Sequence, residues 1–200
     1  RLLEHVGDDE DQKQLSVYLG QGGYEGLRRA VTMAPDAVIE EISTAYVRGR
    51  GGAAYPTGRK WGQLARIDGS PKYIVCNADE GEPGTFKDQI LLEKNPYSVI
   101  EGMTIAGRVF GSPKGIIYVR GEYPEEFGIL RACLEQAREA GLLGRGVLGI
   151  EGFDYDIDTV AGGGAYVCGE NSAMLNSIEG KPGRPRIKPP HLAEVGLHGK

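Results

Sequence analysis

The 200-residue chain has little cysteine and little histidine. Its three cysteines, Cys76, Cys133 and Cys168, are odd in number and widely spaced. They therefore exclude a disulfide framework and favour a reducing compartment. Three cysteines cannot supply a four-cysteine iron–sulfur or zinc site, and the three histidines show no ligand spacing. We therefore expect no metal site within this chain.

An excess of basic charge and long apolar runs are also missing. The formal net charge is −5, and no basic stripe alternates with aromatic residues, which argues against a nucleic-acid partner. No run approaches the roughly 18 apolar residues that a membrane span requires. We therefore expect a protein of the cytoplasm.

Glycine is abundant instead. The chain holds 32 glycines, more than twice the average usage of roughly 7%. They cluster at 49–52, 141–152 and 162–169, between segments that have the patterns of helices and strands. Glycine is required where the backbone takes a positive φ or comes very close to another group, so these clusters mark candidate ligand-binding turns.

The apolar pattern predicts an α/β layered fold. Short buried strands are expected at 73–76 and 115–120, and the alternation over 153–160 predicts a third. Helices are expected from 35 to the glycine break at 49, from near 56, and over 87–94, 96–109, 124–140 and 170–178. Strands that alternate with long helices indicate a mostly parallel sheet.

The glycine-rich loop from Arg48 to Trp61 has the composition of a phosphate cradle. Its small residues let backbone N–H groups converge on an anion, and the helix that follows offers its positive N-terminal end. Lys60 adds a point charge one turn into that helix. The spacing is neither that of a Walker loop nor that of the Rossmann fingerprint. A plain turn between two packed helices is the alternative.

The acidic loop from Asn77 to Thr85 follows the first buried strand. In open α/β sheets, ligands bind at the carboxyl ends of the strands. The three carboxylates of this loop would repel a phosphate, so hydroxyl groups, an amide-bearing ring or a cation would be better partners. A ribityl chain fits this description. The alternative is a solvated acidic turn closed by Pro83-Gly84.

The third glycine segment, Gly162 to Asn171, has the pattern of a turn from a strand into a helix. Glu170 and Asn171 would then lie at a helix N-terminus, near any anionic ligand. Capping of the helix is the alternative function for these two residues.

Taken together, the three segments resemble the FMN-binding, NADH-oxidising subunit of respiratory complex I. The same family includes the flavin subunits of NAD-linked hydrogenases and formate dehydrogenases. The motifs that carry the resemblance are RGRGGAAYPTGRKW at 48–61, CNADEGEPGTFKD at 76–88 and GAYVCGENSAMLNSIEGKPGRPRIKPP at 164–190. The resemblance implies a Rossmann-like α/β domain that binds FMN as cofactor and NAD(H) or NADP(H) as substrate.

The resemblance also assigns roles to individual residues, motif by motif. It implies that the flavin is held by Gly49, Arg50, Gly51, Gly52, Lys60, Asn77, Asp79, Glu80, Tyr166, Gly169, Glu170 and Asn171. The positions that would face the dinucleotide are Tyr55, Gln63, Glu82 and His191, with Glu82 near the nicotinamide. No side chain is expected to act as an acid or base, because the flavin carries the chemistry.

The resemblance implies a larger assembly as well. It divides the chain into a helical lead-in (1–34), an FMN/NAD-binding domain (35–190) and the start of a linker (191–200). The chain starts without Met and ends at Gly199-Lys200, so we expect it to be a piece of a longer protein whose β-rich and 4Fe-4S-binding parts follow. The implied partners are a thioredoxin-like 2Fe-2S subunit and a larger iron–sulfur subunit. To the expected cytoplasmic location the resemblance adds the alternative of a peripheral position on the cytoplasmic side of a membrane complex.

Several positions depart from the family pattern. The family usually reads Gly-Ala-Gly-Phe-Pro-Thr-Gly where this chain has Ala54 and Tyr55, and Gln63 and His191 replace aromatic residues that commonly help clamp the adenine. Asn171 stands where the family normally has a glutamate, whose charge would repel a 2′-phosphate. We therefore hypothesise that the protein tolerates NADPH. The alternatives are neutral drift in an enzyme that uses only NADH, and a flavin-carrying electron-transfer subunit with a degenerate dinucleotide site.

Overall fold

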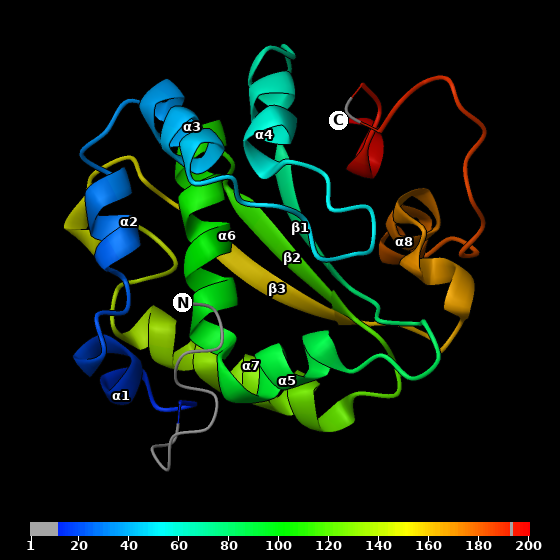
Figure 1. Cartoon of the computed structure of the whole chain (residues 1–200), viewed down its shortest axis with the longest axis horizontal. Coiled ribbons are helices and arrows are strands. Elements are labelled where there is room, and N and C mark those ends of the chain that lie inside the picture. The colour runs from blue at the N-terminus through cyan, green and yellow to red at the C-terminus, as the bar shows by residue number, and fades with distance from the viewer. Residues whose placement is uncertain (1–11, 193) are drawn as a thin grey trace.

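Three parallel strands form the centre of the molecule. The computed structural model describes residues 12–192 and 194–200. Strands β1 (Tyr73–Ala78), β2 (Lys114–Val119) and β3 (Asp156–Ala161) lie in the order β1-β2-β3 (Figure 1). The register pairs Ala78 with Val119 and Val119 with Ala161, so the three strands end level with one another.

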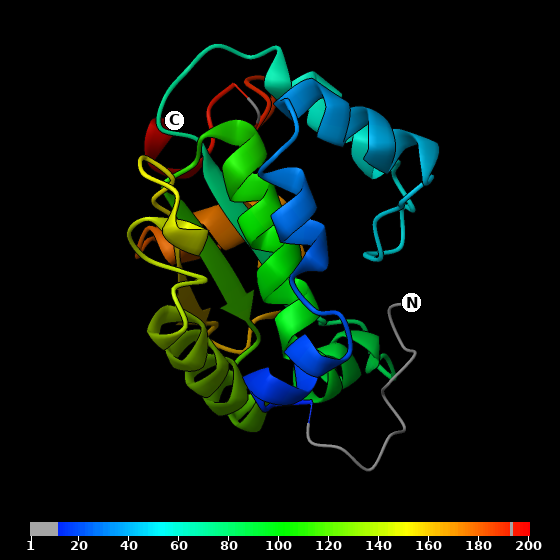
Figure 2. The same cartoon turned by 90° about the vertical axis from the view of Figure 1, so that its left-hand side faces the viewer.

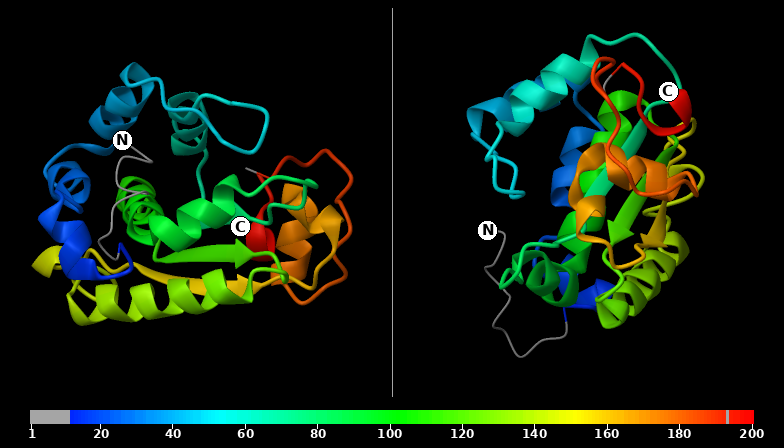
Figure 3. Two further views of the ribbon diagram at one scale, coloured as in Figure 1. Left: turned by 60° about the horizontal axis from the view of Figure 1, so that its bottom comes forward. Right: turned by 90° about the vertical axis from the view of Figure 1, so that its right-hand side faces the viewer.

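Helices cover both faces of this sheet, which explains why β2 is apolar on both sides. Ile117 and Val119 face a large core that includes side chains of α6 (Pro96–Phe110) and α7 (Pro124–Glu139). Ile116 and Tyr118 face a second core formed with α8 (Asn171–Ile178). Figure 3 shows the same arrangement from two further sides.

The remaining helices pack on the α6 side of the sheet, whereas two of the 3-10 turns contribute Cys168 and Leu197 to the second core. They are α1 (Leu15–Gly20), α2 (Glu25–Ala30), α3 (Pro35–Thr44), α4 (Thr57–Ala65), α5 (Lys87–Lys94) and the short 3-10 turns η1 (Val147–Gly149), η2 (Tyr166–Gly169) and η3 (Leu197–Gly199). Helices α3 and α4 pack closely, since a Cβ at Gly58 would lie 2.7 Å from Ser43 Cα. Trp61 on α4 meets Phe110 of α6 with ring centroids 5.3 Å apart.

The α/β class and the parallel sheet that the sequence predicts are confirmed. Three boundaries differ by more than one residue. α3 ends at Thr44 and does not run on to the glycine break at 49, because Tyr46 takes a positive φ of 54° that a right-handed helix does not allow. β3 begins at Asp156 rather than 153, because Tyr155 and Gly144 form an isolated antiparallel bridge just before it. β1 continues to Ala78, so Asn77 belongs to the strand and not to the loop. Within the described part of the chain, no helix is long and apolar enough to cross a membrane.

The lead-in packs on the main body through one buried carboxylate. Residues 1–11 of the expected lead-in lie outside the described residues. Glu101 on α6 is 8% exposed and accepts hydrogen bonds from the backbone N–H of Tyr24 (2.8 Å) and Leu27 (2.9 Å) and from the Tyr18 hydroxyl (2.6 Å). Leu15 and Leu27 belong to the same core as α6 and α7. The division of the chain at residue 34 stays a prediction.

Replacing Glu101 with alanine should therefore destabilise the fold strongly. The substitution leaves two buried N–H groups without an acceptor, and we expect the free energy of unfolding to fall by about 3 kcal/mol. Urea unfolding followed by circular dichroism measures this. Glu40→Ala, at an exposed position on α3, should change the stability by less than about 0.5 kcal/mol. Equal stability of the two variants would contradict the anchoring role.

Candidate functional site

The carboxyl ends of the three strands bring three connecting segments together. Asp79, Arg120 and Gly162 are the residues that directly follow β1, β2 and β3. A Cβ at Gly121 would lie 2.5 Å from the carbonyl oxygen of Gly162, so the second and third connections approach too closely for a side chain. This edge is where ligands bind in open parallel sheets.

Asn77 joins the acidic loop to the third glycine segment. Its side-chain amide donates to the Gly169 carbonyl (2.9 Å) and to Asn171 Oδ1 (3.1 Å). Its Oδ1 accepts from the backbone N–H of Asp79 at 3.2 Å. The structure thus unites four residues that the sequence assigns to one site, although more than 90 positions separate Asn77 from Gly169 and Asn171.

A second contact joins the same two segments on the solvent side. The Tyr166 hydroxyl donates to the Glu82 carboxylate at 2.8 Å, and Tyr166 is 65% exposed. The hydrogen bond to this carboxylate raises the pKa of Tyr166. Both groups face solvent, where an incoming substrate could reach them.

The Glu80 side chain points into the protein, unlike that of Glu82. Its side chain is 2% exposed and accepts from Lys87 Nζ (3.0 Å) and from the backbone N–H of Asp88 (3.1 Å) and Gln89 (3.3 Å) at the start of α5. Tyr123 donates a further bond of 3.2 Å. Burial alone raises the pKa of Glu80, but these donors outweigh burial and the pKa is lowered. The carboxylate is therefore engaged inside the protein, whereas the sequence assigns Glu80 to flavin contact.

Glu170 and Asn171 lie at the N-terminus of α8, as the sequence predicts. The Glu170 carboxylate caps the helix and accepts from the backbone N–H of Ser172 and Ala173, both at 2.9 Å. Lys188 Nζ lies 3.4 Å from the same carboxylate. Burial raises the pKa of Glu170, but these hydrogen bonds dominate and lower it. The capping role is confirmed, and the Asn171 side chain is exposed beside it.

The glycine loop is held by its own backbone. The Gly49 N–H donates to the Tyr55 carbonyl (2.9 Å), and the Thr57 N–H donates to the Val47 carbonyl (2.8 Å). Ala54 has φ 48°, in the left-handed region that favours the glycine usual in the family. In the described part of the chain, no hydrogen bond links this loop to the acidic loop or to 162–171. Figure 2 shows the loop standing out from the body.

The polar groups of the glycine loop remain exposed. Gly51 and Gly52 have open space around them, and Arg50 and Lys60 are exposed. The structure also brings together two residues assigned to the dinucleotide, because the Tyr55 hydroxyl donates to Gln63 Oε1 at 3.1 Å. Among the contacts described, His191 meets neither of them, and its backbone N–H donates to Glu194 at 2.9 Å.

Sequence reasoning missed Arg120. Its guanidinium donates to the carbonyl oxygen of Glu80, pairs with Glu122 (2.8 Å) and lies 5.1 Å from the centre of the Tyr123 ring. Arg120 follows a buried strand directly, so the rule that ligands bind at strand carboxyl ends would have indicated it.

This donor set fits an anionic ligand that also carries hydroxyl or amide groups. Exposed cations and the N–H groups of an open glycine loop suit a phosphate. The amide of Asn77 and the carboxylates of Asp79 and Glu82 suit hydroxyls and ring N–H groups. Among the residues that the structure describes, no three His, Cys, Asp or Glu side chains are grouped to hold a metal ion.

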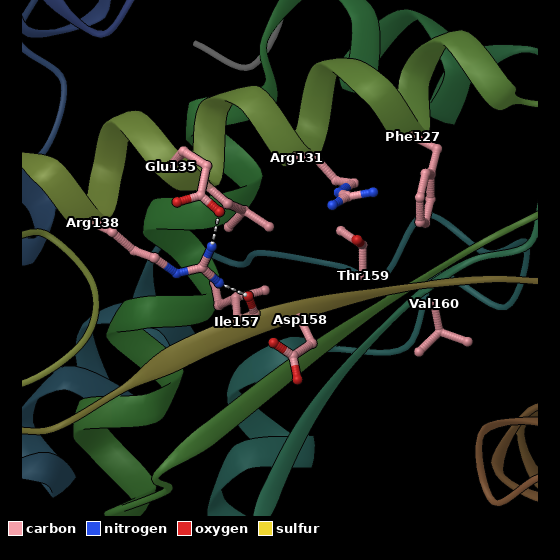
Figure 4. Close-up of a pocket in the computed structure, with 9 residues that line it drawn as sticks. Phe127, Arg131, Glu135, Arg138, Ile157, Asp158, Thr159 and Val160 are labelled. Carbon is pink, nitrogen blue, oxygen red and sulfur yellow. Dashed lines mark hydrogen bonds and ion pairs between the residues drawn. The ribbon is translucent and has the colours of Figure 1, made fainter.

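A groove of about 370 Å³ lies elsewhere, between α7 and the open edge of β3. Figure 4 shows Arg131 above Thr159, and Arg138 bonded to Glu135 and to the Ile157 carbonyl. None of the residues that the sequence assigns to cofactor or substrate lines this groove. The candidate site is therefore the carboxyl edge of the sheet and not this groove.

A parallel sheet with helices on both faces and polar loops at its carboxyl edge is the architecture of a nucleotide-binding α/β protein. The family is more specific. Residues 42–198 match the family model described as the Nuo51 FMN-binding domain, so the chain belongs to that family. The resemblance drawn from the three motifs is thereby confirmed.

Individual relatives support the family assignment. The chain is 48% identical over 183 residues to an NADH-quinone oxidoreductase subunit of Aquifex aeolicus, covering 92% of the chain and 42% of the relative. It is 45% identical to an NADP-reducing hydrogenase subunit, HndC, of Solidesulfovibrio fructosivorans, covering 95% of the chain and 38% of the relative. The chain thus spans less than half the length of these two relatives.

The fold is shared with a solved structure. An NAD+-reducing [NiFe]-hydrogenase in its H2-reduced state contains a chain that matches with a TM-score of 0.80 and 35% sequence identity. The match covers 99% of this chain and 31% of the hydrogenase chain. The Rossmann-like architecture is therefore confirmed by a solved relative as well as by the family.

The buried carboxylate of Glu80 gives a pH-dependent prediction. Because the folded-state pKa is lowered from 4.5, the charged form stabilises the fold above that value, and the stabilisation is lost as the pH falls below it. We expect the stability advantage of wild type over Glu80→Gln to decline between about pH 5 and pH 3. Urea unfolding across this range measures the difference. Glu125→Gln, an exposed change, should give no such decline, and an equal slope would contradict the assignment.

Proposed function

We propose that this chain is the FMN-binding part of a subunit that oxidises NADH within a multi-subunit oxidoreductase. The observation that carries the proposal is the junction of the acidic loop with 162–171, which Asn77 bridges at the carboxyl edge of the sheet. Membership of the Nuo51 FMN-binding family supports FMN as the ligand of that junction. The names of the relatives, an NADH-quinone oxidoreductase subunit and a hydrogenase subunit, support the reaction class.

Two groups of residues would bind different parts of the FMN molecule. Gly51 and Gly52 would present N–H groups to the phosphate, beside Gly49, whose own N–H is bonded to the Tyr55 carbonyl, and Arg50 and Lys60 would add positive charge. Asn77, Asp79 and the 169–171 turn would meet the hydroxylated chain and the ring. The Asp79 side chain is half-buried, and burial raises its pKa while Arg120 opposes that shift.

Hydride acceptance is the chemistry that bound FMN would supply, with electrons then leaving singly to iron–sulfur clusters. The side chains have to hold the two reactants face to face. Glu82, bonded to the Tyr166 hydroxyl, would orient the nicotinamide end of the dinucleotide. Tyr55, bonded to Gln63, would stack on the adenine end.

The wider assembly belongs to the same proposal. Three cysteines cannot hold a 4Fe-4S cluster, so the cluster would be bound outside these 200 residues. The thioredoxin-like 2Fe-2S subunit and the larger iron–sulfur subunit are the partners we infer. We propose a cytoplasmic position, or a peripheral one on the cytoplasmic side of a membrane complex, as part of the same assembly. The domain division at 34 and 190 is proposed on the same basis.

Flavin binding and reduction test the proposal directly. The full-length protein should quench the fluorescence of added FMN, and NADH added without oxygen should bleach the flavin absorbance. Lys60→Met should weaken FMN binding about tenfold, which corresponds to about 1.4 kcal/mol. The matched variant Lys94→Met, on an exposed lysine of α5, should bind FMN like wild type.

The other outcomes discriminate among the alternatives. Failure to bind FMN would refute the proposal. FMN that is bound but not bleached by either dinucleotide would identify a flavin-carrying electron-transfer subunit with a degenerate dinucleotide site instead.

Asn171 supports a second proposal, that the enzyme also accepts NADPH. Asn171 is exposed at the start of α8 and carries no charge to repel a 2′-phosphate. Lys188, whose amine lies 3.4 Å from the Glu170 carboxylate, offsets the negative charge of Glu170 at the same turn. A relative that is 45% identical is named an NADP-reducing hydrogenase subunit, which agrees with this interpretation.

The charge at position 171 should control the preference between the two dinucleotides. We expect Asn171→Glu to lower kcat/KM for NADPH relative to NADH by about tenfold, because a carboxylate repels the extra phosphate. Steady-state kinetics with both substrates measure the ratio. Asn171→Gln keeps a neutral amide and should keep the wild-type ratio. An unchanged ratio in Asn171→Glu would refute the proposal and show that residue 171 has no effect on the dinucleotide preference.

A further inference from the structure

Arg120 is tied on three sides, and two of its partners, Glu80 and Tyr123, belong to the acidic loop or contact it. Its Nη1 donates to the carbonyl oxygen of Glu80. Its Nε and Nη2 donate to the two carboxylate oxygens of Glu122 at 3.0 and 2.8 Å, a two-point contact that fixes the plane of the guanidinium. The guanidinium also stacks over Tyr123, 5.1 Å from the ring centre.

Tyr123 completes the arrangement from the other side. Its hydroxyl donates to the buried carboxylate of Glu80 at 3.2 Å. The turn between β2 and α7 therefore holds both the backbone and the side chain of Glu80. Glu80 stands between Asp79, assigned to the flavin, and Glu82, assigned to the dinucleotide.

We propose that Arg120 and Glu122 form a positioning pair that fixes the acidic loop for ligand binding, with Glu122 orienting Arg120 and Arg120 holding Glu80. The inference rests on the proposed function, because it concerns the presentation of Asp79 and Glu82 to the flavin and the dinucleotide. The hydrogen-bond donors of Arg120 that the structure shows are directed at protein atoms, and its side chain is 19% exposed. It therefore acts through the loop and not by touching the ligand.

The physical consequence is preorganisation. A loop that is already held in its binding conformation does not lose conformational freedom when the ligand arrives, so its affinity is higher. Position also matters for the reaction, because small displacements of orienting groups lower the fraction of productive complexes. Loosening the pair should therefore raise the dissociation constant of FMN and the KM for NADH more than it lowers kcat.

The variant Glu122→Gln tests the pair with little risk to folding, because Glu122 is exposed. Gln cannot offer two carboxylate oxygens, so the guanidinium loses its fixed plane. Glu125→Gln, an exposed change three positions along, removes the same charge without touching Arg120, and it controls for the altered net charge near an anionic ligand. Arg120→Lys keeps the charge but not the two-point contact and serves as a second variant, with Arg131→Lys as its control.

Two measurements on the full-length protein decide the question. The first is hydrogen exchange of the backbone amides of 81–86 in the flavin-free protein, which needs no enzymatic activity. We expect exchange to be about threefold faster or more in Glu122→Gln and Arg120→Lys, and unchanged in both controls. The second is the FMN dissociation constant and the KM for NADH, each rising about threefold or more with kcat changed less than twofold. In Arg120→Lys, adding Glu122→Gln should produce little further change.

Several results would overturn the proposal. One is that Glu122→Gln and Arg120→Lys match their controls in exchange and in both constants. Another is that they lower the melting temperature but leave exchange at 81–86 and the constants unchanged, which would show a purely structural pair. If the wild type binds no FMN, the proposed function fails, while the exchange comparison still decides whether the pair positions the loop.

Discussion

The parallel register of the sheet is the constraint on which the candidate site depends. Because Ala78, Val119 and Ala161 are level with one another, the next residue of each strand enters the same small region. The register is in turn fixed by burial, since a shift of one residue would turn Ile117 and Val119 out of the main core and Ile116 and Tyr118 out of the second. The packing of β2 between two layers of helices therefore determines which polar groups meet at the carboxyl edge.

Neighbouring carboxylates in the acidic loop have different roles because their surroundings differ. Glu80 is turned inward, where Lys87, two N–H groups of α5 and Tyr123 satisfy it. Glu82 is turned outward and meets only the exposed Tyr166 among the contacts described for its side chain. Because the ionised carboxylate of Glu80 is paired with Lys87 inside the protein, a phosphate-bearing ligand encounters less negative charge at this loop. This explains how an acidic loop can belong to the site of an anion.

The sequence predicts the elements well and individual side-chain directions poorly. The strands at 73–76 and 115–120 follow from their apolar runs, and the helix expected over 87–94 has the same bounds in the structure. The inward direction of Glu80 depends on Tyr123, which lies 43 positions away and contacts it only after the sheet has formed. The role of Arg120 is hidden for the same reason. Motifs identify the glycine loop and 164–171, but the bond of Asn77 to Gly169 and Asn171 required the structure.

At this site, the residues assigned to dinucleotide preference can change without loss of the hydrogen bonds that hold the fold. The contact between Asn77 and Asn171 uses only an oxygen acceptor at position 171, and the carboxylate of a glutamate offers the same kind of acceptor. The helix cap is supplied by Glu170 and not by Asn171. The charge at position 171 can therefore change while the bridge to β1 and the start of α8 stay intact. The same holds for Tyr55 and Gln63, which bond to each other on an exposed loop and helix away from both cores. Selection can thus alter the charge that the dinucleotide meets without disturbing the fold of these segments, because the bridge from Asn77 and the Glu170 cap both remain.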